Sequence, residues 1–229
     1  MTEIDWFKIE NKDKDFPFYK KNPYVPKWGW IVLIIATIIG LILSLSSNII
    51  YVILSAIVLI VPILYFLKWD YKVIIDKPSL KDILLAIGLF IGYMVYAVIL
   101  GYILQYIFGL NGANLIPDNI TIMTFVSLAF KLISEELIKF IPFMFLLRLS
   151  YKFSAKRKFS TILSIVLVMI FFAFLHAANL QTFLFAIGVQ GIGSIFEFIG
   201  YIKTKNLVVS YITHLCTDIF IFLSPFLGI

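Results

Sequence analysis

Long apolar runs, separated by short polar segments, dominate this chain of 229 residues. The runs are about as long as the 20 residues that a helix needs to cross a bilayer, and they lack the strict alternation of apolar and polar positions that marks a strand. Because lipid leaves open backbone groups unsatisfied, such runs favour helices. We predict an all-α fold, a polytopic membrane bundle of about seven transmembrane helices at residues 29–47, 49–67, 82–108, 122–149, 161–180, 182–201 and 207–225.

The composition agrees with a membrane protein. Hydrophobic residues make up 62% of the chain and charged residues only 14%, with a mean hydropathy of +1.02. Soluble domains carry about 25% charged residues. The net charge of +6 would suit nucleic acid in a soluble protein, but here the basic residues gather at the ends of apolar runs, so we expect lipid and no nucleic acid as partner. The single cysteine, Cys216, excludes an internal disulfide framework.

The charge of the connecting segments predicts domain organisation and orientation. Residues 1–27 form a charged tail, and residues 28–229 form the bundle. Every alternate connection is basic, whereas the segments 46–48, 109–121 and 177–182 contain no Lys or Arg. By the positive-inside rule, the N-terminus is cytoplasmic and the C-terminus lies outside. The basic residues of these segments are Lys8, Lys12, Lys14, Lys20, Lys21, Lys27, Lys68, Lys72, Lys77, Lys81, Lys152, Lys156, Arg157, Lys158, Lys203 and Lys205.

The fourth predicted span contains four ionisable residues, Lys131, Glu135, Glu136 and Lys139. Each charge at the centre of a spanning helix costs about 2.5–3.5 kcal/mol, so the segment must face protein or water. Lys131, Glu135 and Lys139 follow at four-residue steps on one helix face, and Glu136 points about 100° away. Either they form a self-neutralised polar stripe, or one carboxylate remains available for chemistry.

Later apolar runs contain His176, His214 and Asp218. A lone membrane histidine is commonly a hydrogen-bonded packing residue. The four-residue step from His214 to Asp218, however, places imidazole and carboxylate on one helix face, where the carboxylate can fix the histidine tautomer or help to bind a metal. Cys216 points to the opposite side, which argues against a Cys–His nucleophile.

Two histidines and two or three carboxylates on otherwise uncharged helices are the groups that hydrolysis requires. They provide a base for water, a proton donor and a partner for an oxyanion. Either a zinc site of two histidines and one carboxylate or a metal-free pair of glutamate and histidine can activate the water. The sequence leaves the cofactor open between these two.

Three motifs resemble those of the CPBP superfamily of intramembrane proteases, which includes CAAX-processing endopeptidases and the bacterial Abi and PrsW-like enzymes. The family pattern is Glu-Glu, then Phe-x-x-x-His, then His-x-x-x-Asn or Asp. It is matched here, over about residues 120–220, by Glu135-Glu136, by Phe172 to His176 and by His214 to Asp218.

The resemblance implies an intramembrane endopeptidase that hydrolyses a peptide bond of a membrane-associated or prenylated, CAAX-like substrate. In this interpretation Glu135 with His176 activates water, and His214 with Asp218 holds the oxyanion. Glu136, Lys139 and Phe172 would support them. If a zinc site exists, we expect its ligands to be Glu135, His176 and His214.

Two positions depart from the CAAX-type pattern. Phe140 stands where that pattern has Arg, and the basic residue is Lys139, a spacing closer to PrsW-like members. An ammonium cannot reproduce the bidentate contact of a guanidinium with Glu136. Asp218 replaces Asn, and an ionised carboxylate cannot donate to an oxyanion, so Asp218 must be protonated, orient His214 or bind a metal.

Other classes of function stay open at this stage. A non-catalytic scaffold or a bacteriocin self-immunity protein of the same superfamily would keep its function without Glu135. An ion or proton transporter would use Lys131, Glu135 and Lys139 as a relay, although no inverted repeat is visible. Glu197, in the sixth span, belongs to none of the motifs, and we expect it either to line the substrate path or to form a buried pair with a lysine such as Lys131.

Overall fold

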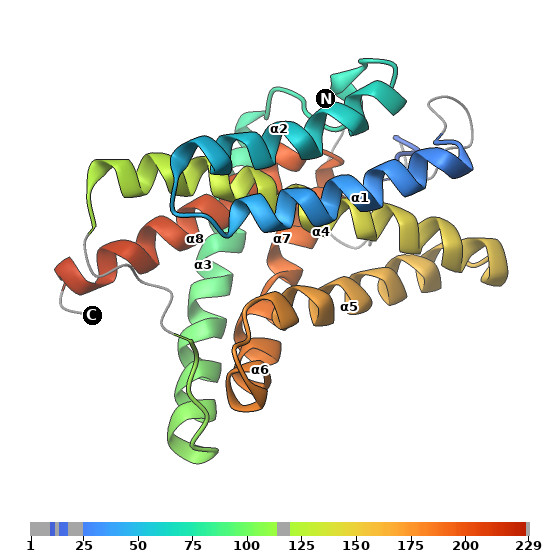
Figure 1. The fold of residues 1–229 in the computed structure, drawn as a ribbon. Helices are drawn as coiled ribbons and strands as arrows, with labels where there is room; N and C mark the ends of the chain where they lie inside the picture. The colour runs from blue at the N-terminus through green and yellow to red at the C-terminus, as the bar shows by residue number, and fades with distance from the viewer. Residues whose placement is uncertain (1–9, 12–13, 18–24, 114–119, 228–229) are drawn as a thin grey trace.

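The computed structural model describes residues 10–11, 14–17, 25–113 and 120–227, and the regular elements within these ranges are all helical (Figure 1). The predicted all-α class is confirmed. The elements are α1 (Lys27–Ser44), α2 (Ile49–Phe66), η1 (Tyr71–Val73), α3 (Leu80–Tyr102), η2 (Ile103–Ile107), α4 (Ile122–Ser154), α5 (Arg157–Leu175), α6 (Leu180–Ala186), η3 (Ile187–Ile192), α7 (Ile195–Thr204) and α8 (Leu207–Leu227).

Six helical segments among the described residues are long and apolar enough to cross a membrane. They are α1, α2, α3 with η2, α5, the segment Leu180–Thr204 and α8. The remaining predicted span, the fourth (122–149), is α4, whose 33 residues make a helix about 50 Å long, well beyond the roughly 30 Å of hydrocarbon. The chain is therefore a multi-pass integral membrane protein.

Helix boundaries differ from the prediction mainly around His176. The predicted fifth span, 161–180, is shifted, because α5 runs from Arg157 to Leu175. The next helix begins at Leu180, since the Asn179 side chain caps it by accepting from the Thr182 backbone N–H at 2.9 Å. The segment then passes through the π-helical turn η3 before α7, so the predicted sixth span is three joined pieces.

Helix α4 is the central element of the fold, in contact with α1, α2, α5 and α8. Its interior face carries Phe143, Met144 and Leu147 into the main hydrophobic core. In the view of Figure 1, α3 and the segment from α6 to α7 run steeply across α1, α2 and α4. This arrangement brings the middle of α4 against α8 and the beginning of α7.

Polar contacts within the bundle fix how the helices lie against one another. The buried hydroxyls of Ser55 and Ser134 form a short hydrogen bond between α2 and α4, next to the motif carboxylates. Tyr211 of α8 donates to the Ala129 carbonyl of α4 at 3.1 Å. Such interhelical hydrogen bonds are typical of membrane bundles, where apolar burial gives helices no preference for each other over lipid.

Several basic connections meet at one end of the molecule, where part of the N-terminal tail is bound. Glu10 is buried between Arg157, at the start of α5, and Lys205, between α7 and α8. Lys14 reaches Asp76, in the connection before α3, at 3.4 Å. We call Glu10, Arg157 and Lys205 the outer cluster. Their proximity agrees with the prediction that the basic segments share one side of the membrane.

Candidate active site

A buried group of five polar side chains joins α4, α7 and α8. Glu136 and Lys139 come from α4, Glu197 from α7, and Ser210 and His214 from α8, and all five are buried. Lys139 Nζ donates to Glu136 Oε1 at 2.6 Å and forms a short ion pair with Glu197. Ser210 donates a short hydrogen bond to the other oxygen of Glu136. We call these five residues the inner cluster.

The contacts of His214 define its tautomer. Its Nδ1 lies 2.8 Å from Glu136 Oε1, an oxygen that also accepts from Lys139. Because an ionised carboxylate can only accept, Nδ1 carries the hydrogen and donates it. The other ring nitrogen, Nε2, faces Glu135 Oε2 at 3.8 Å and Asp218 Oδ1 at 3.9 Å. Glu136 therefore orients His214 so that Nε2 points at two further carboxylates.

Glu135 and Asp218 are the more accessible carboxylates of the site. Their side chains are 15% and 26% exposed, whereas Glu136 is 6% exposed. Lys131, one turn earlier on α4, lies 3.7 Å from Glu135 and is about half-exposed. The predicted four-residue stripe is thus only half formed, because Lys139 pairs with Glu136 and Glu197 and not with Glu135.

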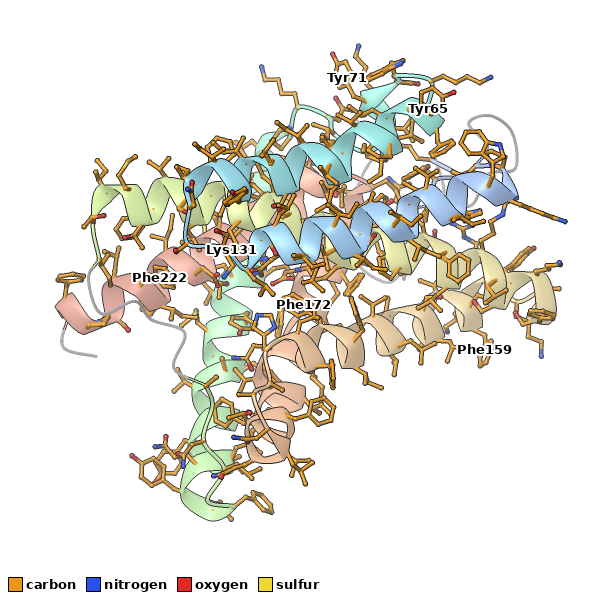
Figure 2. The ribbon with its side chains drawn as sticks, viewed as in Figure 1. Tyr65, Tyr71, Lys131, Phe159, Phe172 and Phe222 are labelled. Atoms are coloured by element: carbon orange, nitrogen blue, oxygen red, sulfur yellow. The ribbon has the colours of Figure 1, made fainter. Side chains whose placement is uncertain are left out.

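His176 ends α5 with its ring held in place. Its Nδ1 lies 2.9 Å from the Phe172 carbonyl, which can only accept, so this nitrogen is the donor and Nε2 is left with a free lone pair. The Phe172 ring lies 4.5 Å from the His176 ring and 6.3 Å from the His214 ring, between centroids. Phe172 and Lys131 both lie near the centre of the molecule in Figure 2.

The structure brings the predicted residues together from three distant stretches of sequence, and it adds two that sequence reasoning missed or left unassigned. Ser210 was missed, although it precedes His214 by four residues and so shares its helix face. Glu197 was noticed, but the lysine that it pairs with is Lys139 and not Lys131. No spacing rule connects Lys139 with Glu197, because they lie on different helices and are 58 positions apart in the sequence.

One group of described residues has the spacing of a metal site, and it differs from the predicted zinc ligands. Glu136, Glu197 and His214 offer ligand atoms within 4.8 Å of one another. The Lys139 ammonium, however, contacts all three of them, with its Nζ 3.4 Å from His214 Nδ1. A lysine thus already supplies the positive charge that a metal ion would bring there.

A small cavity lies beside this group, between α4, α7 and α8. Its volume of about 10 Å³, measured for the centre of a water molecule, is room for about one water. None of its lining residues comes from α5. The lining residues are Glu136, Lys139, Phe140, Glu197, Phe198, Tyr201, Leu207 and Ser210.

Part of the chain matches a known protein family. Residues 117–220 match the Rce1-like family, described as type II CAAX prenyl endopeptidase Rce1-like. This segment is Rce1-like. The match spans α4 to most of α8 and includes all three motifs, which confirms the resemblance to the CPBP superfamily and supports a membrane protease. No curated protein and no solved structure matches the chain.

Proposed function

We propose that this protein is an intramembrane endopeptidase that cleaves a peptide bond near the C-terminus of a membrane-associated, CAAX-like substrate. The observation that carries the proposal is the orientation of His214. Its Nδ1 is fixed by Glu136 while its Nε2 faces Glu135 and Asp218, and the Phe172 ring packs against both His214 and His176. Structural ion pairs do not require a second imidazole nitrogen turned toward further carboxylates. Such a nitrogen beside a carboxylate is the arrangement that general acid–base hydrolysis uses.

In the proposed reaction Glu135 is the general base. It takes one proton from a water molecule, and the resulting hydroxide attacks the substrate carbonyl carbon. His176, with the lone pair of Nε2 free, accepts a hydrogen bond from the same water. The tetrahedral oxyanion then collapses, the C–N bond breaks, and protonated Glu135 returns its proton to the leaving amine.

We assign stabilisation of the oxyanion to His214 and Asp218. His214 donates from Nε2 when that nitrogen carries a hydrogen, and Asp218 Oδ1, 3.9 Å from Nε2, holds the ring in this orientation. This assignment also accounts for Asp in place of Asn, because Asp218 then acts on His214 and does not need to donate itself.

We propose a metal-free mechanism. The only metal-like spacing among the described residues is already filled by the Lys139 ammonium, which pairs with two of its three members. Lys139 would take the place of the arginine of the CAAX-type pattern, and its 2.6 Å contact with Glu136 shows that the shorter spacing still reaches this carboxylate.

The proposed substrate class fits the membrane orientation expected from the chain's charge distribution. A CAAX sequence is a C-terminal signal on the cytoplasmic side of a membrane, often next to polybasic residues and a lipid. The chain's own charge distribution supports a cytoplasmic N-terminus and cytoplasmic basic connections. We therefore expect substrates to approach from that side while their lipid stays in the bilayer.

Substitution of Glu135 by Gln tests the proposal. The variant keeps the size of the side chain but removes the base, so cleavage of membrane-tethered, prenylated peptides by purified protein should fall to background. Asp70→Asn, the matched change at an exposed carboxylate, should cleave normally. Full cleavage by Glu135→Gln would exclude the protease mechanism, and unchanged cellular function would favour a scaffold. Loss of activity with a zinc chelator, together with bound zinc near one per chain, would exclude the metal-free form.

A further inference from the structure

We propose that Glu197, which lies outside all three motifs, is a positioning residue of the protease site. It holds the Lys139 ammonium so that Glu136 keeps a free lone pair for His214 Nδ1. The inference rests on the proposed function, because it assigns a role within the same reaction.

The backbone that carries Glu197 is fixed against α4 by aromatic packing. Phe198 and Tyr201 follow Glu197 on α7, and both rings pack on Phe143. Their ring centroids lie 5.5 Å and 6.2 Å from that of Phe143. Tyr201 also packs on Phe140 at 5.0 Å. The Glu197 side chain is only 8% exposed, so its carboxylate has little freedom to leave the cluster. A carboxylate held this firmly can set the place of a flexible lysine.

Competition for Glu136 Oε1 explains why a second carboxylate is needed. Lys139 Nζ at 2.6 Å and His214 Nδ1 at 2.8 Å both donate to this one oxygen, while Ser210 donates to Oε2. A carboxylate oxygen offers two lone-pair sites, and an ammonium carries three donors. Glu197 accepts a second N–H of the Lys139 ammonium, so that fewer of the lysine's donors are directed at Glu136.

Without Glu197, Lys139 would have one carboxylate left. Its ammonium already lies 3.4 Å from His214 Nδ1. If Lys139 bound Glu136 alone, its ammonium would move closer to His214 Nδ1, which is also a donor. The repulsion between the two donors would weaken the hydrogen bond from Nδ1 to Glu136. Nδ1 would then lose its hydrogen in part of the population, and Nε2 would no longer face Glu135 and Asp218 in one defined state.

A purely structural buried ion pair is the alternative, and it predicts different results. Removing Glu197 still leaves Lys139 an ion-pair partner in Glu136, so the lysine charge is not stranded. A structural role would change stability but leave the folded enzyme with normal chemistry. A positioning role changes the chemical step itself.

The kinetic test compares Glu197→Gln with Asp70→Asn, using the peptide assay. We expect kcat to fall by about 10–100-fold, the usual loss when the outer partner of a functional ligand is removed, with KM changed less than about twofold. Glu197→Asp, which keeps the charge, should recover part of the loss. An unchanged kcat in Glu197→Gln overturns the proposal. If Glu197→Gln does not fold, Glu197→Asp decides, since a wild-type kcat with the shortened side chain would also overturn it.

A spectroscopic test reads the tautomer directly. The chain has only two histidines, so His176→Gln labelled with ¹⁵N-histidine reports His214 alone. We expect a single state with a protonated Nδ1 in this background and a mixture of protonated and unprotonated Nδ1 after Glu197→Gln is added, and an unchanged spectrum would overturn the proposal. The two hypotheses fail separately. If Glu135→Gln still cleaves, the proposed function is wrong, whereas if only Glu135→Gln is inactive and Glu197→Gln is normal, this inference alone is wrong.

Discussion

The inner and outer clusters both contain a buried carboxylate between cationic side chains, but only the inner cluster contains a histidine. Each buries a carboxylate between cationic groups from separate parts of the chain: Glu136 inside the bundle, and Glu10 at its basic end. The outer cluster consists of Glu10, Arg157 and Lys205, without a histidine. The inner cluster contains His214, whose second nitrogen faces further carboxylates. Burial of charge alone therefore does not identify a site, whereas an oriented imidazole with a free nitrogen does.

The outer cluster has the properties of a structural ion-pair network that holds the N-terminal tail against the bundle. Arg157 binds Glu10 in bidentate fashion, with Nε 2.9 Å from Oε2 and Nη2 2.6 Å from Oε1. Burial raises the pKa of the Glu10 carboxyl, but the hydrogen bond from Arg157 and the charge of Lys205 outweigh it, so the pKa lies below its usual value. For Lys205, burial lowers the pKa below its usual value although Glu10 opposes this. Glu10 is thus ionised at neutral pH and stabilises the fold there.

The largest expected effect distinguishes the two clusters by activity. Glu136→Gln should lower kcat about 10,000-fold, the loss observed when the carboxylate that orients a catalytic histidine becomes an amide. The reason is that the amide replaces one acceptor oxygen by an NH2 donor, so the side chain no longer fixes the hydrogen on Nδ1 of His214. Lys139 remains paired with Glu197, so the variant should fold. Peptide cleavage by purified protein, with thermal unfolding measured alongside, checks both statements.

Glu10→Gln is the control for that experiment, because it makes the same change in the outer cluster. Its kcat should stay within about twofold of the wild type. If instead both variants lost activity equally, the outer cluster would belong to the catalytic machinery and the comparison would fail.

The sequence predicted the spans well because each depends on local properties. Apolar run length alone located α1, α2 and α3, and helix periodicity predicted that His214 and Asp218 share a face. The pairing of Lys139 was harder, since periodicity offered Glu135 and Glu136 as neighbours and only the packing of α7 on α4 brings in Glu197.

The outer cluster was not predicted for a similar reason. Glu10 lies in a tail that reads as a solvated charged segment, with nothing in its spacing that points to Arg157, 147 positions away. The π-helical turn between α6 and α7 also left no signal, because it depends on how that segment packs on α5. Contacts between distant segments were thus inferred only where a family motif linked them.

The second prediction concerns the stability of the outer cluster. Glu10→Gln should lower the free energy of unfolding by about 3 kcal/mol, because it leaves the Lys205 ammonium, 2% exposed, without the carboxylate that balances it. Chemical unfolding in detergent, followed by circular dichroism, measures the difference. Adding Lys205→Met should recover part of the loss, since no buried charge then remains at that position. A loss in the double variant equal to the sum of the two single losses would contradict this account.

The pH dependence of the same pair has a defined sign. The pKa of Glu10 is lower in the folded protein than its usual value of 4.5, so its contribution is present above pH 4.5 and is lost as the pH falls below that value. The difference in unfolding free energy between wild type and Glu10→Gln should therefore shrink in acid. A difference that stayed constant down to pH 3 would show that the charge of Glu10 is not its source.

The smallest expected effect comes from the exposed ion pair of the same tail. Lys14 and Asp76 lie 3.4 Å apart, but their side chains are 39% and 51% exposed, and such pairs are worth between 0 and about 1 kcal/mol. Lys14→Met should therefore change the free energy of unfolding by less than about 0.5 kcal/mol, and raised salt should remove even that. The substitution is made at Lys14 because Asp76 has other partners: its carboxylate accepts from the Lys77 backbone, and its own backbone bonds Asn206. A loss as large as that of Glu10→Gln would mean that docking of the tail as a whole, and not burial of the Glu10 carboxylate, gives the outer cluster its strength.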